Sequence, residues 1–270
     1  MQSGNLAKNQ YGLRMQVIAV YSEAGGVSKT TTAVSLAMSA ALMGKRVVVI
    51  DLDPRAAATK WLNIQPVGEG LDVGAILASA EDTEGFAEQL AVQSTWSPNL
   101  RVIPSARSVS NREADRADHA ELRLATSLVG LNADLVVLDC PNRQGGPLIL
   151  SALNAATTVV YAAKPDVDGV DGYLGARDSV QKFMAARKRI GAPANLKEAG
   201  IIVSGIETIP SRISKVSIAD FEATGQLLYP IIPHRVIVKE MRLTNQWYGT
   251  FQKGDVVAEA YAALAEKVVS

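Results

Sequence analysis

The stretch "YSEAGGVSKTTTAV", residues 21–34, has most of the parts of a phosphate-binding loop. Such a loop reads G-x-x-x-x-G-K-[ST], follows a strand and precedes a helix. Lys29 and Thr30 supply its last two positions, whereas Glu23 and Ser28 stand where the two glycines belong. The alternative to a nucleotide loop is a glycine turn with a solvent-exposed lysine, so the surroundings of the stretch decide its meaning.

Those surroundings are a strand and a helix. The segment "MQVIAVY" (15–21) is apolar and β-branched, which predicts a strand. The segment "TTTAVSLAMSAALM" (30–43) has a helical composition and is followed by Gly44, a typical residue at a helix C-terminus. The stretch therefore has the context that a phosphate-binding loop requires.

Strand-like and helix-like segments alternate along the rest of the chain. Short apolar runs predict buried strands at residues 46–50, 100–104, 134–139, 157–163 and 199–205. Helices are expected at 110–128, opened by a capping box of Ser110 and Glu113, at 170–190 and at 256–269. The predicted fold class is α/β: a doubly wound, mostly parallel sheet flanked by helices, as in P-loop NTPases.

Composition narrows the class of protein further. Of the 270 residues, 48% are hydrophobic and 20% are charged, which is typical of a globular chain. We expect one domain over residues 15–270, preceded by a flexible leader at 1–14.

No apolar run has the length of a membrane span and no signal-peptide core is present, so we expect a cytoplasmic protein without a membrane partner. The formal net charge is zero, so any contact with nucleic acid must come from a local patch.

Two further motifs end in carboxylates. In "VVVIDLDPR" (47–55) a buried strand is followed by Asp51 and Asp53, and "DLVVLDC" (134–140) ends its apolar run at Asp139. Ligands of open α/β sheets bind at the carboxyl ends of the strands, and a carboxylate there can hold Mg²⁺. Each aspartate alone could be a helix N-cap. The three motifs together, in this order, favour a nucleotide site.

The segments "AGGVSKTTTAVSLA", "VVVIDLDPR" and "LVVLDCP" resemble the Walker A, switch I and Walker B segments of the ParA/MinD family. The "DLDP" and "DCP" forms are more similar to ParA-type DNA-partition ATPases than to MinD. The resemblance runs from about residue 15 to the end, with weaker motifs after 165. It implies ATP and Mg²⁺ as cofactors, and a homodimer that forms with ATP and separates after hydrolysis.

The resemblance also implies roles for residues. Lys29 and Asp53 would be catalytic, with Asp53 orienting the attacking water. The metal site would be formed by Thr30, Asp139 and Asp51, and Asp51 would also couple the switch to the nucleotide. Nucleotide contacts would come from Gly25, Gly26, Val27, Ser28, Lys29, Thr30, Thr31 and Pro233. Pro233 is placed by "LYPIIPHR" (228–235), which resembles the family's proline-bearing adenine loop after the last strands.

The chain departs from the family at two positions. The signature lysine, which reaches the partner's nucleotide in the dimer, falls at Ala24, and Ser28 replaces a glycine. Lys164 and Arg55 are the candidates for a replacement cation, although a solvated surface residue is the alternative for each. We expect slow ATP hydrolysis, because a transition-state cation is missing.

The implied partners are non-specific double-stranded DNA and a ParB-like protein bound to a centromere-like site. The candidate DNA contacts are Arg187, Lys188, Arg189, Arg212, Lys215, Lys239 and Arg242, each of which could instead be a solvated charge. The predicted function is nucleoid-associated partition of a plasmid, phage or chromosome. The alternatives are a ParA-like ATPase that positions a protein cargo and a non-hydrolysing nucleotide-dependent scaffold. A MinD-like membrane switch is disfavoured by the alanine-rich tail, and a nitrogenase-iron-protein-like reductase by the single cysteine, Cys140.

Overall fold

A computed structural model describes residues 15–79, 81–194 and 196–269, so the predicted leader lies outside the described residues. Its strands form one eight-stranded sheet in the order β3-β4-β2-β5-β1-β6-β7-β8. All neighbouring strands are parallel except the short β3, which runs antiparallel to β4. The strands are β1 (Gln16–Tyr21), β2 (Val47–Asp51), β3 (Val92–Gln93), β4 (Leu100–Ile103), β5 (Leu135–Asp139), β6 (Thr158–Ala163), β7 (Lys197–Ile206) and β8 (Leu227–Pro233).

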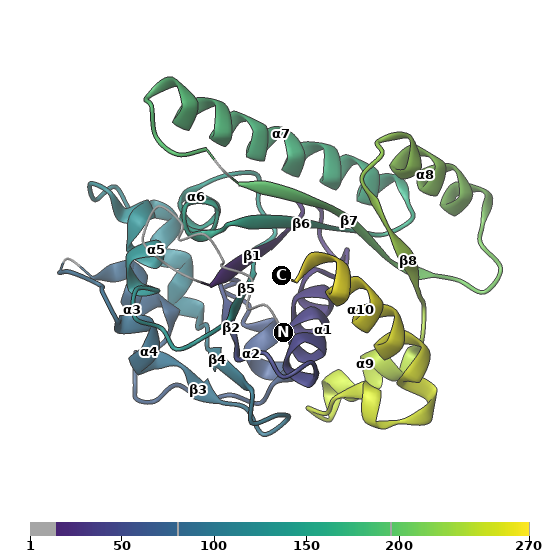
Figure 1. The fold of residues 1–270 in the computed structure, drawn as a ribbon, viewed down its shortest axis with the longest axis horizontal. Coiled ribbons are helices and arrows are strands. Elements are labelled where there is room, and N and C mark those ends of the chain that lie inside the picture. Colours follow the sequence, from purple (N-terminus) through teal and green to yellow (C-terminus); the bar gives the residue numbers. More distant parts are fainter. Residues whose placement is uncertain (1–14, 80, 195, 270) are drawn as a thin grey trace, which may run out of the picture.

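Helices cover both faces of this sheet (Figure 1). On one face lie α3 (Val73–Ala78), α4 (Phe86–Leu90), α5 (Arg123–Ser127), α6 (Pro147–Ala155), α7 (Val167–Arg189) and α8 (Arg212–Ala223). On the other lie α1 (Lys29–Leu42), α2 (Ala57–Trp61), α9 (Val236–Leu243) and α10 (Asp255–Val268). This arrangement confirms the predicted doubly wound α/β class. None of the described helices is long and apolar enough to cross a membrane.

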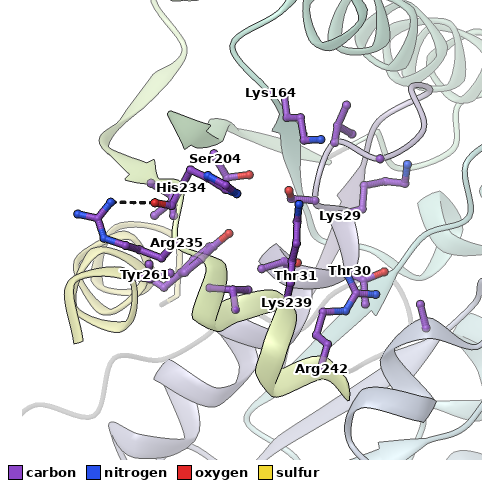
Figure 2. Close-up of a pocket in the computed structure, with 18 of the residues that line it drawn as sticks. Lys29, Thr30, Thr31, Lys164, Ser204, His234, Arg235, Lys239, Arg242 and Tyr261 are labelled. Carbon is purple, nitrogen blue, oxygen red and sulfur yellow. Dashed lines mark hydrogen bonds between the residues drawn. The ribbon is translucent and has the colours of Figure 1, made fainter. Parts of the chain in front are cut away.

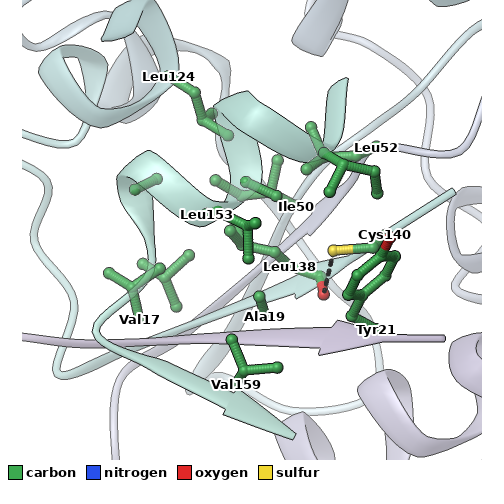
Figure 3. Close-up of a cluster of buried hydrophobic side chains, with 14 of the residues drawn as sticks. Val17, Ala19, Tyr21, Ile50, Leu52, Leu124, Leu138, Cys140, Leu153 and Val159 are labelled. Carbon is green, nitrogen blue, oxygen red and sulfur yellow. Dashed lines mark hydrogen bonds between the residues drawn. The ribbon is translucent and has the colours of Figure 1, made fainter. Parts of the chain in front are cut away.

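Side chains of the central strand alternate between the two cores. Val17, Ala19 and Tyr21 of β1 pack on the α3–α8 side, which Figure 3 shows, whereas Ile18 and Val20 pack on the α1–α10 side. Both sets are fully buried. The continuous apolar runs seen in the sequence follow from this, because a strand covered on both faces has no solvent-facing side.

The predicted strands and three of the four predicted helices are present with boundaries within a few residues. The predicted helix at 110–128 is wrong. That segment forms the 3₁₀ helices η1 (Arg107–Ala114) and η2 (Ala120–Leu122), followed by α5. The groups of the expected capping box are used elsewhere: Ser110 donates its hydroxyl to the Arg107 carbonyl, and Glu113 pairs with Arg143. Asp115 also accepts from the Ala117 backbone and pairs with Arg123, which favours a turn over a continuous helix.

The segment 228–235 also differs from expectation. We expected a proline-bearing loop after the last strands, but most of it is the edge strand β8, hydrogen-bonded to β7. Pro233 is the last residue of that strand. A proline is tolerated there because an edge strand needs no donor on its free side.

The carboxyl ends of β1, β2 and β5 lie next to one another. Val20 of β1 and Asp51 of β2 are both in register with Asp139 of β5. The loop that follows β1 and the aspartates that end the other two strands therefore meet at one edge of the sheet.

Candidate nucleotide site

The loop between β1 and α1 has two residues in the left-handed backbone region. Gly26 has φ 70° and Ser28 has φ 68°. Glycine adopts this conformation without strain, whereas serine does so at a cost. No side chain of the described residues caps the start of α1, so the first backbone N–H groups of this helix are available to an anion.

Lys29, the first residue of α1, is turned back onto its own loop. Its Nζ donates a hydrogen bond to the Ala24 carbonyl over 2.8 Å, and only 8% of the residue is exposed. Burial lowers the pKa of Lys29, and the nearby Asp139 carboxyl opposes this shift. The ammonium group therefore lies beneath the loop, where a negatively charged oxygen would be a stronger acceptor than the Ala24 carbonyl.

Asp139 is fully buried, and neither carboxylate oxygen has a hydrogen-bond partner among the described residues. Burial and repulsion from Asp51 raise its pKa well above the ordinary value. The Thr30 hydroxyl lies close enough to oppose that shift, although no hydrogen bond of normal geometry joins the two side chains. A buried carboxylate without a donor is unfavourable unless a cation or a bound water completes it.

These residues fit Mg²⁺ held together with a phosphate ligand. Among the described residues, no group of three or more His, Cys, Asp or Glu side chains is arranged to hold a metal by itself. Mg²⁺ commonly uses one or two protein oxygens and completes its shell with water and phosphate. Thr30 and Asp139 are of that kind, and the unpartnered oxygens of Asp139 are the observation that supports the fit.

Asp51, in contrast, has its oxygens occupied. One accepts from the backbone N–H and the hydroxyl of Thr59, over 2.9 and 2.8 Å, and the other accepts from the Asp53 N–H. Burial raises the pKa of Asp51 to about 6. Asp51 thus holds the start of the 51–59 turn in place, and the half-buried Asp53 at its tip accepts from the Arg55 N–H over 2.9 Å.

A cavity of about 670 Å³ opens above the loop. Figure 2 shows its walls, which come from α1, α9, α10 and the ends of β6, β7 and β8. Six basic side chains line it, within the described part of the chain: Lys29, Arg55, Lys164, Arg235, Lys239 and Arg242. The acidic lining residues are Asp53 and Glu207, and Glu207 pairs with His234 over 2.9 Å. The cavity therefore favours a ligand with several negative charges.

Most of the predicted site residues lie together. The cavity is lined by Gly26, Val27, Ser28, Lys29, Thr30, Thr31, Asp53, Arg55, Lys164 and Pro233, and also by Lys239 and Arg242, which we expected at a DNA surface. Gly25, Asp51 and Asp139 do not line it. A Cβ on Gly25 would lie 2.8 Å from the Asn142 amide, and both aspartates are buried beneath the loop.

The sequence analysis missed several lining residues. Asn142 follows the Asp139 motif by three positions, so the same motif could have indicated it. Ser204, Glu207 and Tyr261 also line the cavity, from the end of β7, the loop after it and α10. These three carry no local sequence signal, because only the packing of distant elements brings them to the loop.

The chain matches known proteins over the same segments. Residues 15–189 match a protein-family model, AAA_31, described as an AAA domain. The chain is 31% identical over 176 residues to the sporulation initiation inhibitor protein Soj of Bacillus subtilis, covering 63% of this chain and 67% of Soj. It is 36% identical over 169 residues to a putative replication protein A of Rhizobium rhizogenes, covering 58% of this chain but only 42% of that relative. The chain thus spans less than half of the latter protein.

The chain belongs to the ParA-type ATPases of this AAA-domain family. Its fold also matches solved structures. Apo McdA from Cyanthece superposes with a TM-score of 0.78 over 93% of this chain and 99% of McdA, at 21% identity. That likeness concerns the fold alone.

In this ParA-type chain Ala24, in the first half of the loop, packs against α7. A Cβ built on Gly172 would lie 2.7 Å from the Ala24 nitrogen and closer still to its Cβ. The Glu23 N–H donates to the Gly172 carbonyl over 3.1 Å, and the Glu23 carboxylate accepts from Ser179 over 2.8 Å. These hydrogen bonds and close contacts hold the first half of the loop against α7.

Replacing Ser28 with glycine tests the strain in the loop. We expect Ser28→Gly to stabilise the protein by about 0.5–1 kcal/mol, because the left-handed conformation costs a non-glycine residue about 1–2 kcal/mol and part of the gain is lost to the greater chain entropy of glycine. Urea unfolding of the two proteins measures the difference. A lower midpoint for Ser28→Gly would contradict this interpretation.

Proposed function

We propose that this ParA-type chain is an ATP-dependent partition protein that dimerises with ATP, binds non-specific DNA and hydrolyses ATP slowly. A ParB-like protein on a centromere-like site would stimulate it, and the segregated cargo would be a plasmid, phage or chromosomal replicon. The observation that carries the proposal is the unpartnered Asp139 carboxylate, buried near Lys29 beneath the loop that lines a basic cavity. Several curated relatives have names that refer to chromosome partitioning.

The geometry supports the following proposed roles. Lys29 exchanges its bond to the Ala24 carbonyl for phosphate oxygens, and the backbone of the loop donates to the same phosphates. Thr30 and Asp139 would hold Mg²⁺, which would neutralise charge on the phosphates. Asp53 orients the attacking water. Asp51 accepts a hydrogen bond from the Asp53 N–H and so holds the turn that carries Asp53. We propose Lys164 as the better candidate for the cation missing at position 24, because it lines the cavity from the end of β6.

The proposed DNA contacts lie on α7 and α8; α8 packs beside one end of α7, and the last turn of α7 lies at the other end (Figure 1). Lys188 and Arg189 are exposed in the last turn of α7, and Arg212 and Lys215 are in α8. Arg187 already donates to Asn154 and to the Pro193 carbonyl, so its contribution would be weaker. In a nucleoid-bound dimer these charges would be doubled, and they would contact phosphates without reading sequence.

Binding to non-specific duplex DNA tests the proposal. The protein is titrated onto a fluorescent duplex with ATP and Mg²⁺, with ADP and Mg²⁺, and without nucleotide, over a salt series. We expect tight binding with ATP alone and a steep loss of affinity as salt rises, because lysine and arginine contacts to phosphate release counterions. Equal or absent DNA binding in all three conditions would contradict it and favour a scaffold.

A further inference from the structure

Helix α9 presents two basic residues to the cavity. Lys239 and Arg242 are three positions apart, so they share one face of the helix. Both line the cavity together with the loop residues, and Figure 2 shows their side chains extending from α9 towards the start of α1, where Thr30 and Thr31 lie. A DNA-facing role would not require this placement.

Neither side chain is neutralised. In residues 15–79, 81–194 and 196–269, no ion pair and no side-chain hydrogen bond involves Lys239, and the contact recorded for Arg242 is with the ring of Trp61, 5.6 Å from its centroid. Both side chains are exposed and lie three positions apart on one helix face, so a bound anion that contacts both would be attracted by each. The pair is thus suited to a polyphosphate.

The helix that carries them is held firmly. Ile237 and Met241 are buried beneath α9, at 8% and 9% exposure. Just after the helix, the Gln246 N–H donates to the Met241 carbonyl, and the Gln246 carbonyl accepts from the indole of Trp61. A backbone that is already ordered need not be ordered when its side chains bind a ligand, which removes one cost of binding.

We propose that Lys239 and Arg242 are nucleotide-phosphate ligands supplied by the same chain, on the side of the cavity opposite the loop. The inference rests on the proposed function, because it assigns further ligands to the same nucleotide. It removes both residues from the DNA surface. An arginine can bind phosphate oxygens through two N–H groups at once, and it would add positive charge to a site whose signature lysine position is Ala24.

The inference also links the nucleotide to the chain's tryptophans. Arg242 lies over Trp61, and Trp61 lies against Trp96, which in turn lies against Trp247. The chain has no other tryptophan. If Arg242 binds phosphate, its position over Trp61 changes, so ATP will change the intrinsic fluorescence of the protein.

The test is ATP affinity, measured by calorimetry with Mg²⁺ present, for Lys239→Ala, Arg242→Ala and Arg242→Lys. The matched controls are Lys253→Ala and Arg107→Ala, which change exposed residues outside the cavity. We expect Kd to rise about 10-fold or more for each alanine variant, because each loses a charge-assisted hydrogen bond. The Kd of Arg242→Lys should lie between those of the unaltered protein and Arg242→Ala, and the Kd of each control should equal that of the unaltered protein. The fluorescence change on adding ATP should be lost in Arg242→Ala.

Unchanged ATP affinity in both alanine variants would overturn the inference. So would a Lys239→Ala protein that binds ATP normally but loses DNA at saturating ATP, because that result makes Lys239 a DNA contact. Failure of the unaltered protein to bind ATP would instead overturn the proposed function itself. If Arg242→Ala does not fold because Trp61 is uncovered, Lys239→Ala carries the test, since the Lys239 side chain forms no ion pair or hydrogen bond with any described residue.

Discussion

Replacing Asp139 with asparagine is expected to stabilise the nucleotide-free protein while abolishing ATP turnover. At pH 7 the folded chain either buries this charge or takes up a proton that the unfolded chain does not bind, and both cost free energy. An asparagine has the same size and no charge. We expect about 1–3 kcal/mol of added stability, measured by urea unfolding without nucleotide. Turnover should fall about 100-fold or more, because a developing charge loses its metal support.

The pH dependence provides an internal check on this prediction. The pKa of Asp51 is raised to about 6 in the folded protein, and that of Asp139 is raised as well. The folded state therefore binds more protons than the unfolded state, so stability falls as pH rises from about 4 through 6. In Asp139→Asn this loss should be smaller, since one of the two groups no longer titrates. The same pH dependence of stability in both proteins, or a lower stability of Asp139→Asn, would contradict the conclusion that the buried Asp139 carboxylate destabilises the nucleotide-free protein.

Replacing Gly172 with alanine is expected to destabilise the protein by about 2 kcal/mol, although alanine is the better helix former by about 1 kcal/mol. The added Cβ would lie 2.7 Å from the backbone nitrogen of Ala24 and closer to its Cβ. Neither atom can turn away, so the phosphate-binding loop must move relative to α7. Thermal unfolding should show a Tm several degrees lower, and ATP affinity should weaken with it.

Gly175→Ala is the matched control, one turn further along the same helix. There the added Cβ would meet a carboxylate oxygen of Glu23, which is the far end of a flexible side chain. The carboxylate can move aside and lose its bonds to Ser179 and Tyr21, a cost of about 1–2 kcal/mol that the helix preference offsets in part. A Gly172→Ala protein as stable as Gly175→Ala would show that the loop is not fastened to α7.

The sequence by itself determined the fold class and the base of the site. The central buried strands contain continuous apolar runs. The carboxylates of the candidate site, Asp51, Asp53 and Asp139, follow closely after such runs. Parallel strands bring their carboxyl ends to one edge, so local patterns were enough to place the loop beside the aspartates. The same local rules failed at 110–128, where Ser110 and Glu113 have nearer partners than a helix N-terminus.

Only the tertiary structure decided what surrounds that base. Whether a charged residue faces a ligand, DNA or water depends on which elements pack against its helix, and no short pattern records this. Lys239 and Arg242 are more than 200 positions from the loop they face, and their spacing also suited a solvated helix surface. Likewise, the sequence gives no sign that Ala24 is the point where the loop meets Gly172 of α7 in the fold. Such contacts form only where segments that are far apart in the sequence pack closely together, so a local sequence pattern cannot predict them.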